Sequence, residues 1–185
     1  MVNSTKTQKK VFTTRLIWCI IKTKQNKTKK FDVHPEQRKE GKQMYKSDFE
    51  INKELCEIGR RIYNDGFVAA NDGNFSVKID DNTYYVTPTG VSKGFMTPEM
   101  ICKVDGQGNL KEANGPWKPS SEFKMHLKVY QQRPDVNAVV HAHPPIATSF
   151  AIAGIPLDKL IMPEAIIFLG AVPIAQYGTP STMEI

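Results

Sequence analysis

The chain has 185 residues, of which 40% are hydrophobic and 24% charged, a composition typical of a globular protein rather than a disordered or membrane-spanning one. The net charge of +6 comes from residues 1–43, which carry twelve Lys or Arg against three Asp or Glu, whereas residues 44–185 carry thirteen against sixteen. The larger, slightly acidic part disfavours a nucleic-acid-binding protein.

Residues 1–43 form a basic leader, which we expect to be disordered or non-native. Its lysine tracts would also suit a nucleic-acid or membrane-surface arm, but they lack the interleaved aromatic residues of a base-stacking surface. The one apolar run, residues 16–21, is far shorter than the roughly 20 residues of a membrane span. Lysines follow it where a signal peptide would have small residues. We therefore expect no membrane span, no export, and one folded domain over residues 44–185 that begins near Met44.

The three cysteines are Cys19, Cys56 and Cys102, an odd number without a C-x-x-C pair. This pattern favours a reducing compartment, and hence a cytoplasmic protein, over a disulfide framework or a thiolate zinc site.

Hydrophobic periodicity and turn residues predict interspersed helices and hairpins. Ser47 and Asp48 are a plausible N-cap for a helix over 48–64, whose apolar residues recur every three or four positions. Two β-type runs, 74–79 and 83–87, flank the turn at 80–82, and a further pair is expected around the turn at 105–108. Beyond these we expect a helical turn at 97–99, a helix from 120 to 133, a strand ending at the histidine pair, a helix over 145–153 and a strand over 171–177. This order indicates a mixed α/β sandwich rather than a doubly wound parallel sheet.

The histidine pair follows an apolar run, in the segment Val139-Val140-His141-Ala142-His143-Pro144. Side chains at positions i and i+2 of a strand point to one face, so both imidazoles could reach one metal ion. The alternative is two ordinary histidines beside a turn.

A carboxylate and several small polar residues precede this pair. Glu122 lies at a helix start, where it could be a metal ligand, a base or a helix cap. Ser120 and Ser121 beside it, together with the segments 72–76 and 87–90, have the glycines and the donors of a phosphate-binding site. Each segment alone is more often an ordinary turn.

The four motifs Gly-Asn-x-Ser, Thr-Pro-Thr-Gly, Pro-Ser-Ser-Glu and His-Ala-His-Pro occur in that order. With them, the chain over about residues 48–185 resembles the class II aldolase/adducin-head family. The resemblance implies an α/β fold, a three-layer αβα sandwich with a mainly antiparallel central sheet.

The resemblance also implies a function and a site. A zinc ion, or another divalent metal, would be bound by His141, His143 and Glu122, and Glu122 would also be the catalytic acid/base. The substrate phosphate would be bound by Gly73, Asn74, Thr89, Gly90, Ser120 and Ser121. The implied reaction is cleavage of a ketose 1-phosphate, such as L-fuculose 1-phosphate, to glycerone phosphate and an aldehyde, in a homotetramer with sites at subunit boundaries.

The chain departs from the family pattern in two places. The family draws a further histidine ligand from a later His-Gly segment, which is absent before Ile185, so we expect a C-terminally truncated domain that binds metal weakly. His126 is expected to pack on its helix rather than to ligate. The tyrosine proton donor of the family is also missing between residues 154 and 170, where Glu164 could replace it.

Three alternatives remain open. A phosphopentose 4-epimerase or a sugar-phosphate dehydratase would keep the same histidines, glutamate and phosphate loops. A non-catalytic adducin-like module would have no need of them.

Overall fold

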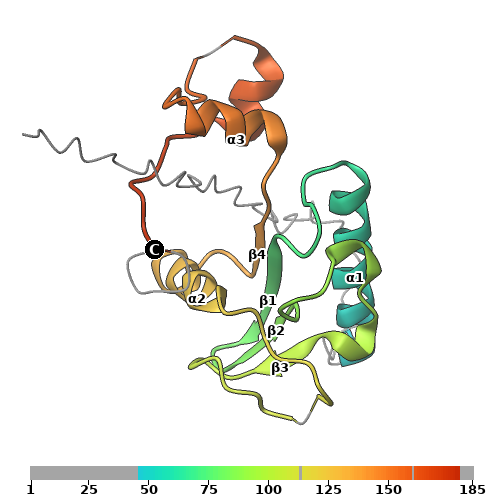
Figure 1. Ribbon diagram of the computed structural model, residues 1–185. Coiled ribbons are helices and arrows are strands. Elements are labelled where there is room, and N and C mark those ends of the chain that lie inside the picture. Colours follow the sequence, from blue (N-terminus) through green and yellow to red (C-terminus); the bar gives the residue numbers. More distant parts are fainter. Residues whose placement is uncertain (1–45, 113, 160, 180–185) are drawn as a thin grey trace, which may run out of the picture.

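The computed structural model describes residues 46–112, 114–159 and 161–179, in which helices cover both faces of one sheet (Figure 1). In chain order the elements are α1 (Asp48–Asn64), β1 (Asn74–Asp80), β2 (Thr83–Val86), η2 (Lys93–Phe95), η3 (Pro98–Met100), β3 (Cys102–Val104), α2 (Phe123–Gln132), β4 (Ala138–His141), α3 (Pro145–Ile152) and η4 (Ala165–Leu169). The strand order is β3-β2-β1-β4, and each neighbouring pair is antiparallel. The predicted α/β fold with its antiparallel sheet is confirmed.

The first helix begins as predicted because its start carries a capping box. Ser47 Oγ accepts a hydrogen bond from the Glu50 N–H at 3.3 Å, and the Glu50 carboxylate accepts one from the Ser47 N–H at 2.8 Å. These bonds satisfy two backbone donors that the first turn would otherwise leave without partners. The helix ends at Asn64, before Gly66 with φ +71°.

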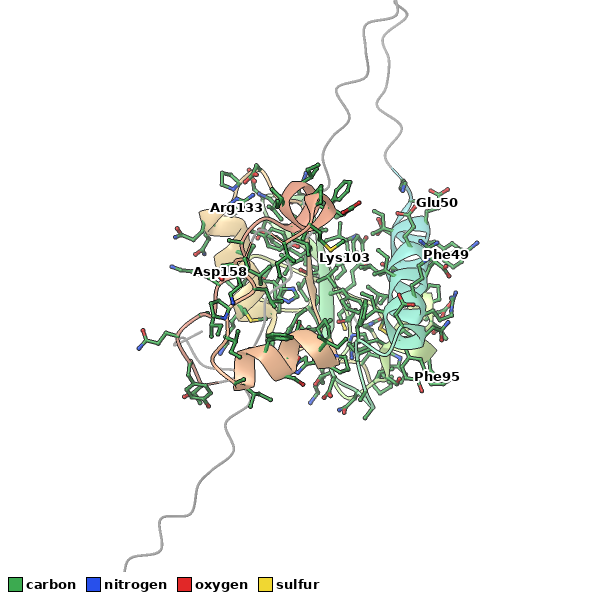
Figure 2. The ribbon with its side chains drawn as sticks, turned by 90° about the horizontal axis from the view of Figure 1, so that it is seen from above. Phe49, Glu50, Phe95, Lys103, Arg133 and Asp158 are labelled. Carbon is green, nitrogen blue, oxygen red and sulfur yellow. The ribbon has the colours of Figure 1, made fainter. Side chains whose placement is uncertain are left out.

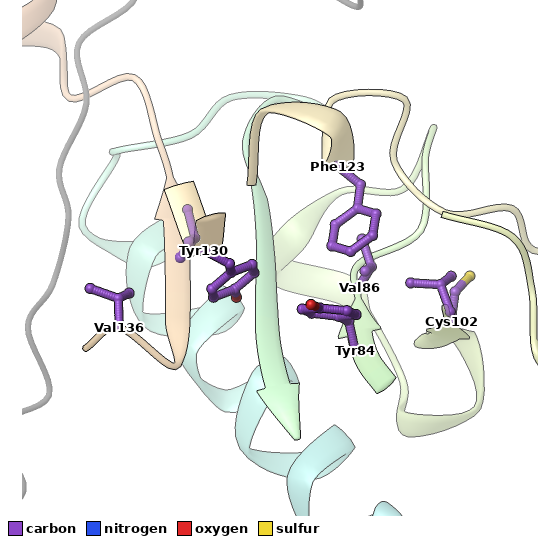
Figure 3. Close-up of a cluster of buried hydrophobic side chains, with 8 residues drawn as sticks. Tyr84, Val86, Cys102, Phe123, Tyr130 and Val136 are labelled. Atoms are coloured by element: carbon purple, nitrogen blue, oxygen red, sulfur yellow. The ribbon is translucent and has the colours of Figure 1, made fainter. Parts of the chain in front are cut away.

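The two faces of the sheet are buried under different helices. Side chains alternate along a strand, so Tyr84 and Tyr85 of β2 point to opposite faces. Tyr84 packs with α2, its ring 5.5 Å from that of Phe123 in an edge-to-face contact, within the cluster shown in Figure 3. Tyr85 packs with Leu55 and Cys56 of α1. The sheet is therefore the middle of three layers.

Figure 2 shows the two outer layers with their side chains. Phe49 and Glu50 lie along α1 at one side of the molecule, and Arg133 and Asp158 lie at the other. The third helix, α3, follows β4 and lies beyond its end rather than over the sheet (Figure 1).

Two predicted strands differ from the structure. The predicted strand over 171–177 is absent: Val172 forms one isolated bridge with Leu157, and residues 173–177 join no sheet. After the turn at 105–108, only Leu110 pairs, in a single bridge with Val104 of β3. An apolar run becomes a strand only where it pairs with a neighbour over several residues, and each of these segments pairs at one residue only.

The predictions for residues 1–43, with Cys19, lie outside the described residues. Cys56 and Cys102 are both buried and free. Across the described residues, each helix is too short or too polar to cross a bilayer.

Candidate active site

The pairing of β1 with β4 builds the centre of the site. In this antiparallel register Asn74, the first residue of β1, lies directly opposite His141, the last residue of β4. Both side chains are buried, and Asn74 Nδ2 lies 3.2 Å from His141 Nδ1. The sheet therefore holds together two residues that are 67 positions apart in the sequence.

Glu122 joins this pair from the start of α2. Its backbone occupies the N-cap position of α2, but its side chain does not cap the helix. Instead, Glu122 Oε2 accepts a hydrogen bond from Asn74 Nδ2 and lies 3.1 Å from His141 Nδ1. The hydrogen bond with His141 lowers the pKa of Glu122 below its usual value, although partial burial opposes this shift. Of the three roles open to Glu122, helix capping is excluded by its contacts.

A turn, and not the alternation of side chains along a strand that we predicted, places His143 beside His141. The strand ends at His141, so strand alternation does not orient His143. The His143 N–H donates to the Phe67 carbonyl at 2.8 Å, which fixes the turn, and the ring centroids of His141 and His143 are 4.8 Å apart. Burial lowers the pKa of His143, which favours the neutral ring.

The donor chemistry of these residues fits a divalent metal ion. The Nε2 atom of His141 is buried and has no hydrogen-bond partner, so it is available as a ligand. Imidazole and carboxylate donors suit Zn²⁺ and several other divalent ions. In the described ranges, however, no three His, Cys, Asp or Glu side chains are already arranged around one point.

Main-chain hydrogen bonds join two of the predicted phosphate-binding segments, residues 87–90 and the segment that carries Ser120 and Ser121. The Thr89 N–H donates to the Lys118 carbonyl at 2.9 Å, and the Ser120 N–H donates to the Thr87 carbonyl at 3.1 Å. An antiparallel bridge between Pro88 and Pro119 lies between these bonds. The Thr-Pro-Thr-Gly and Pro-Ser-Ser-Glu motifs are thus side by side.

A cavity of about 200 Å³ lies where these segments meet. Its lining includes all six residues predicted to bind phosphate, namely Gly73, Asn74, Thr89, Gly90, Ser120 and Ser121. Glu122 and His143 line the same cavity, whereas His141 is not part of the lining. The structure therefore gathers residues from all four sequence motifs at one place.

Asp72 and Pro88 also line the cavity and lie within the predicted segments 72–76 and 87–90. Two further lining residues, Asn71 and Lys93, lie outside the predicted segments. Asn71 adjoins the first segment, so adjacency alone could have indicated it. Lys93 has no such signal, because a lysine after Val-Ser gives no indication that it will be buried. It was found only through the fold.

Two candidate residues stay outside the cavity. His126 is buried, and its Nδ1 lies 2.7 Å from Ser76 Oγ, in agreement with the expected packing role. Glu164 is exposed and does not line the cavity. Within this chain, Glu164 therefore does not reach the site at which it was expected to replace a tyrosine.

Residues 53–185 match the model of the family described as "Class II Aldolase and Adducin N-terminal domain". The chain is 39% identical over 132 residues to L-fuculose phosphate aldolase of Methanococcus maripaludis, which covers 71% of this chain and 70% of that protein. It is 32% identical over 139 residues to 3-oxo-tetronate 4-phosphate decarboxylase of Haemophilus influenzae, which covers 71% of this chain and 63% of that protein.

Solved structures show the same similarity. A structure named L-fuculose 1-phosphate aldolase superposes with a TM-score of 0.65 at 31% identity, over 78% of this chain and 66% of that one. L-fuculose-1-phosphate aldolase of Thermus thermophilus superposes with a TM-score of 0.62 at 28% identity, over 75% of this chain and 67% of that one.

Proposed function

Because the chain belongs to the class II aldolase and adducin N-terminal domain family, we propose that it is a metal-dependent aldolase acting on a phosphorylated ketose. The proposed reaction cleaves a ketose 1-phosphate, such as L-fuculose 1-phosphate, to glycerone phosphate and an aldehyde. The observation that carries this proposal is the cavity in which six predicted phosphate ligands, Glu122 and His143 meet.

We assign some residues of the cavity to phosphate binding and others to proton transfer. Thr89, Ser120 and Ser121 offer hydroxyl donors, and Gly73 and Gly90 allow the backbone to approach the phosphate closely. Asn74 lines the same cavity, but its amide already contacts Glu122 and His141. We assign it the further task of holding the carboxylate in place.

Glu122 is the proposed acid/base. Forming the aldehyde removes the proton of the hydroxyl group on the carbon that becomes the carbonyl, and breaking the C–C bond leaves its electron pair on the phosphate-bearing fragment. A proton must be added to this fragment to give glycerone phosphate. Glu122 lines the cavity, and its contact with His141 favours the ionised form, so Glu122 can take up the hydroxyl proton and return it to carbon. A divalent cation, bound by His141, His143 and Glu122, would supply Lewis-acid stabilisation of the negative charge on the substrate oxygen.

Three finer proposals accompany this one. The metal is Zn²⁺ or a similar divalent ion, the protein works in the cytoplasm, and it assembles as a homotetramer. The exposed apolar side chains support self-association, because eleven of the eighteen large ones in the described residues lie between positions 146 and 169.

Product analysis with Glu122→Gln tests the reaction. We expect the unchanged chain to release glycerone phosphate from L-fuculose 1-phosphate, followed with a coupled reductase, and the variant to be at least about 100-fold slower because it cannot carry the proton. Glu54→Gln, an exposed neutral replacement on α1, is the matched control and should keep the full rate. Release of no glycerone phosphate by the unchanged chain would contradict the aldolase proposal.

Two further measurements test metal binding and the type of reaction separately. Elemental mass spectrometry should find about one divalent metal per chain, lost in His141→Ala. Release of carbon dioxide from 3-oxo-tetronate 4-phosphate, in place of aldol cleavage, would favour the reaction named for the Haemophilus influenzae relative.

A further inference from the structure

Lys93 is a fully buried lysine at the start of η2. Only 1% of its surface is exposed, and the residue is part of the lining of the cavity described above. Its Nζ donates to the Asn71 carbonyl at 3.0 Å and to the Val91 carbonyl at 2.6 Å. Asn71 precedes Gly73 and Val91 follows Gly90, so one ammonium group ties together the two loops that carry these glycines.

The backbone of Lys93 is fixed by close packing against α1. A Cβ atom at Gly59 of α1 would lie 2.4 Å from the Lys93 carbonyl oxygen, and one at Gly94 would lie 2.6 Å from the ring of Tyr63. Both contacts are too short for any residue but glycine, so η2 sits directly on the helix. The position of the lysine is thus set by the scaffold.

The other charged side chains that line the cavity are acidic, so the positive charge of Lys93 matters for binding an anion there. Asp72 and Glu122 line the cavity and are acidic, whereas Lys93 is the one Lys or Arg among the lining residues that the structure describes. The two carboxylates would repel a phosphate dianion, and a cationic side chain would offset this repulsion in addition to the proposed metal ion. An ammonium group has three N–H donors, and the two carbonyls use two of them.

The protonation of Lys93 is suited to this task. Burial lowers the pKa of Lys93 to about 8, while the nearby charges of Asp72 and Glu122 favour the protonated form. The group is therefore mostly charged at neutral pH, and a bound anion would stabilise that charge further.

We propose that Lys93 is the buried cation of the phosphate site: it joins the two loops and supplies the positive charge that a bound phosphate requires. This inference rests on the proposed function, because the anion it binds is the phosphate of the substrate. Lys93 is thus a binding residue for this class of ligand, in addition to the polar residues of the motifs.

Calorimetric titration with inorganic phosphate tests the proposal. Lys93→Gln removes the charge but keeps a donor for the carbonyls, and Lys93→Met keeps the unbranched shape without a donor. We expect each variant to bind phosphate about tenfold or more weakly, since a charge-assisted hydrogen bond is lost. Lys128→Gln removes the same charge from the exposed surface of α2 and should bind as the unchanged chain does. Phosphate binding by either folded Lys93 variant at the original affinity would overturn the role of the lysine and leave the aldolase proposal intact.

The unchanged chain provides a second readout. Near pH 8.5 part of the Lys93 population is neutral, and a bound dianion should raise its pKa, so binding should take up protons. Uptake that is present in the unchanged chain and absent from Lys93→Gln reports Lys93. Binding without proton uptake would also count against the lysine. If the unchanged chain binds no phosphate at all, both this inference and the proposed function fail.

Discussion

His126 makes the acid stability of this protein depend on one buried ring. It has no exposed surface, and burial lowers its pKa from 6.5 to about 3. Between these pH values the unfolded chain binds a proton at this position and the folded chain does not. The contribution of His126 to stability is therefore complete above about pH 6.5 and is lost as the pH falls towards 3.

We expect this linkage to cost about 2 kcal/mol between pH 6.5 and pH 5, measured by urea unfolding. His126→Gln should remove that part of the pH dependence, because glutamine does not titrate. Tyr130→Phe is the matched control: it breaks hydrogen bonds to Ser76 in the same network but keeps the imidazole, so it should lower stability equally at both pH values. An unaltered pH dependence in His126→Gln would show that the ring is not buried in its neutral form.

At the scale of residues, the sequence indicated which residues gather at one place better than it indicated their contacts. The six residues proposed to bind phosphate, together with Glu122 and His143, line one cavity. The contacts of Asn74 were not foreseen, because its position opposite His141 depends on the register of β1 and β4. Lys93 was missed for the same reason, since burial of a lysine comes from tertiary packing.

Among the secondary elements, the entry into β1 depends on a glycine. Gly73 has φ +74°, and a Cβ atom there would lie 2.6 Å from Val68 Cγ1 and 2.8 Å from the His141 carbonyl oxygen. Replacement would therefore strain the backbone and also push apart the strand that carries His141.

Gly73→Ala is expected to cost more than about 2 kcal/mol in unfolding free energy and to abolish glycerone phosphate release. Gly66→Ala offers a matched control, because Gly66 has φ +71° with no atom near its Cβ position. It should cost only the backbone strain, about 1 kcal/mol, and leave activity unchanged. Equal losses of stability in the two variants would show that contact with the His141 backbone does not matter.

Elements with their own local signals were the ones predicted correctly. The capping box at Ser47 places α1, and turn residues place β1 and β2, before any tertiary contact is considered. The predicted strand over 171–177 was wrong because its apolar pattern carries no information about a partner strand. His143 came near His141 through a turn anchored on Phe67, which no periodicity could reveal.

For the whole molecule, the apolar surface over residues 146–169 is the feature that bears on assembly. Phe168 is 80% exposed, and Ile161 and Ile167 are 82% and 73% exposed. Exposed apolar groups this concentrated are typical of a surface that is covered in the working protein. The proposed homotetramer would cover it with further copies of the chain.

Sedimentation velocity tests the assembly. The unchanged chain should sediment as an oligomer, and Phe168→Lys should shift it towards smaller species, because a charge would be buried in the contact. Phe49→Lys makes the same change on α1, where Phe49 is 59% exposed, and should leave the sedimentation unchanged. Sedimentation of the unchanged chain as a single copy would contradict the homotetramer.

Main-chain hydrogen bonds hold the loops together at Thr89 and Ser120. The conformation of these loops therefore does not depend on which side chains line the cavity. These bonds link N–H and carbonyl groups that every residue except proline carries, so they persist when the side chains are exchanged. Evolution can therefore replace the groups that face a substrate one at a time, without rebuilding the loops that present them. A scaffold of this kind can be turned to new reactions, and the chain is similar both to a protein named as an aldolase and to one named as a decarboxylase.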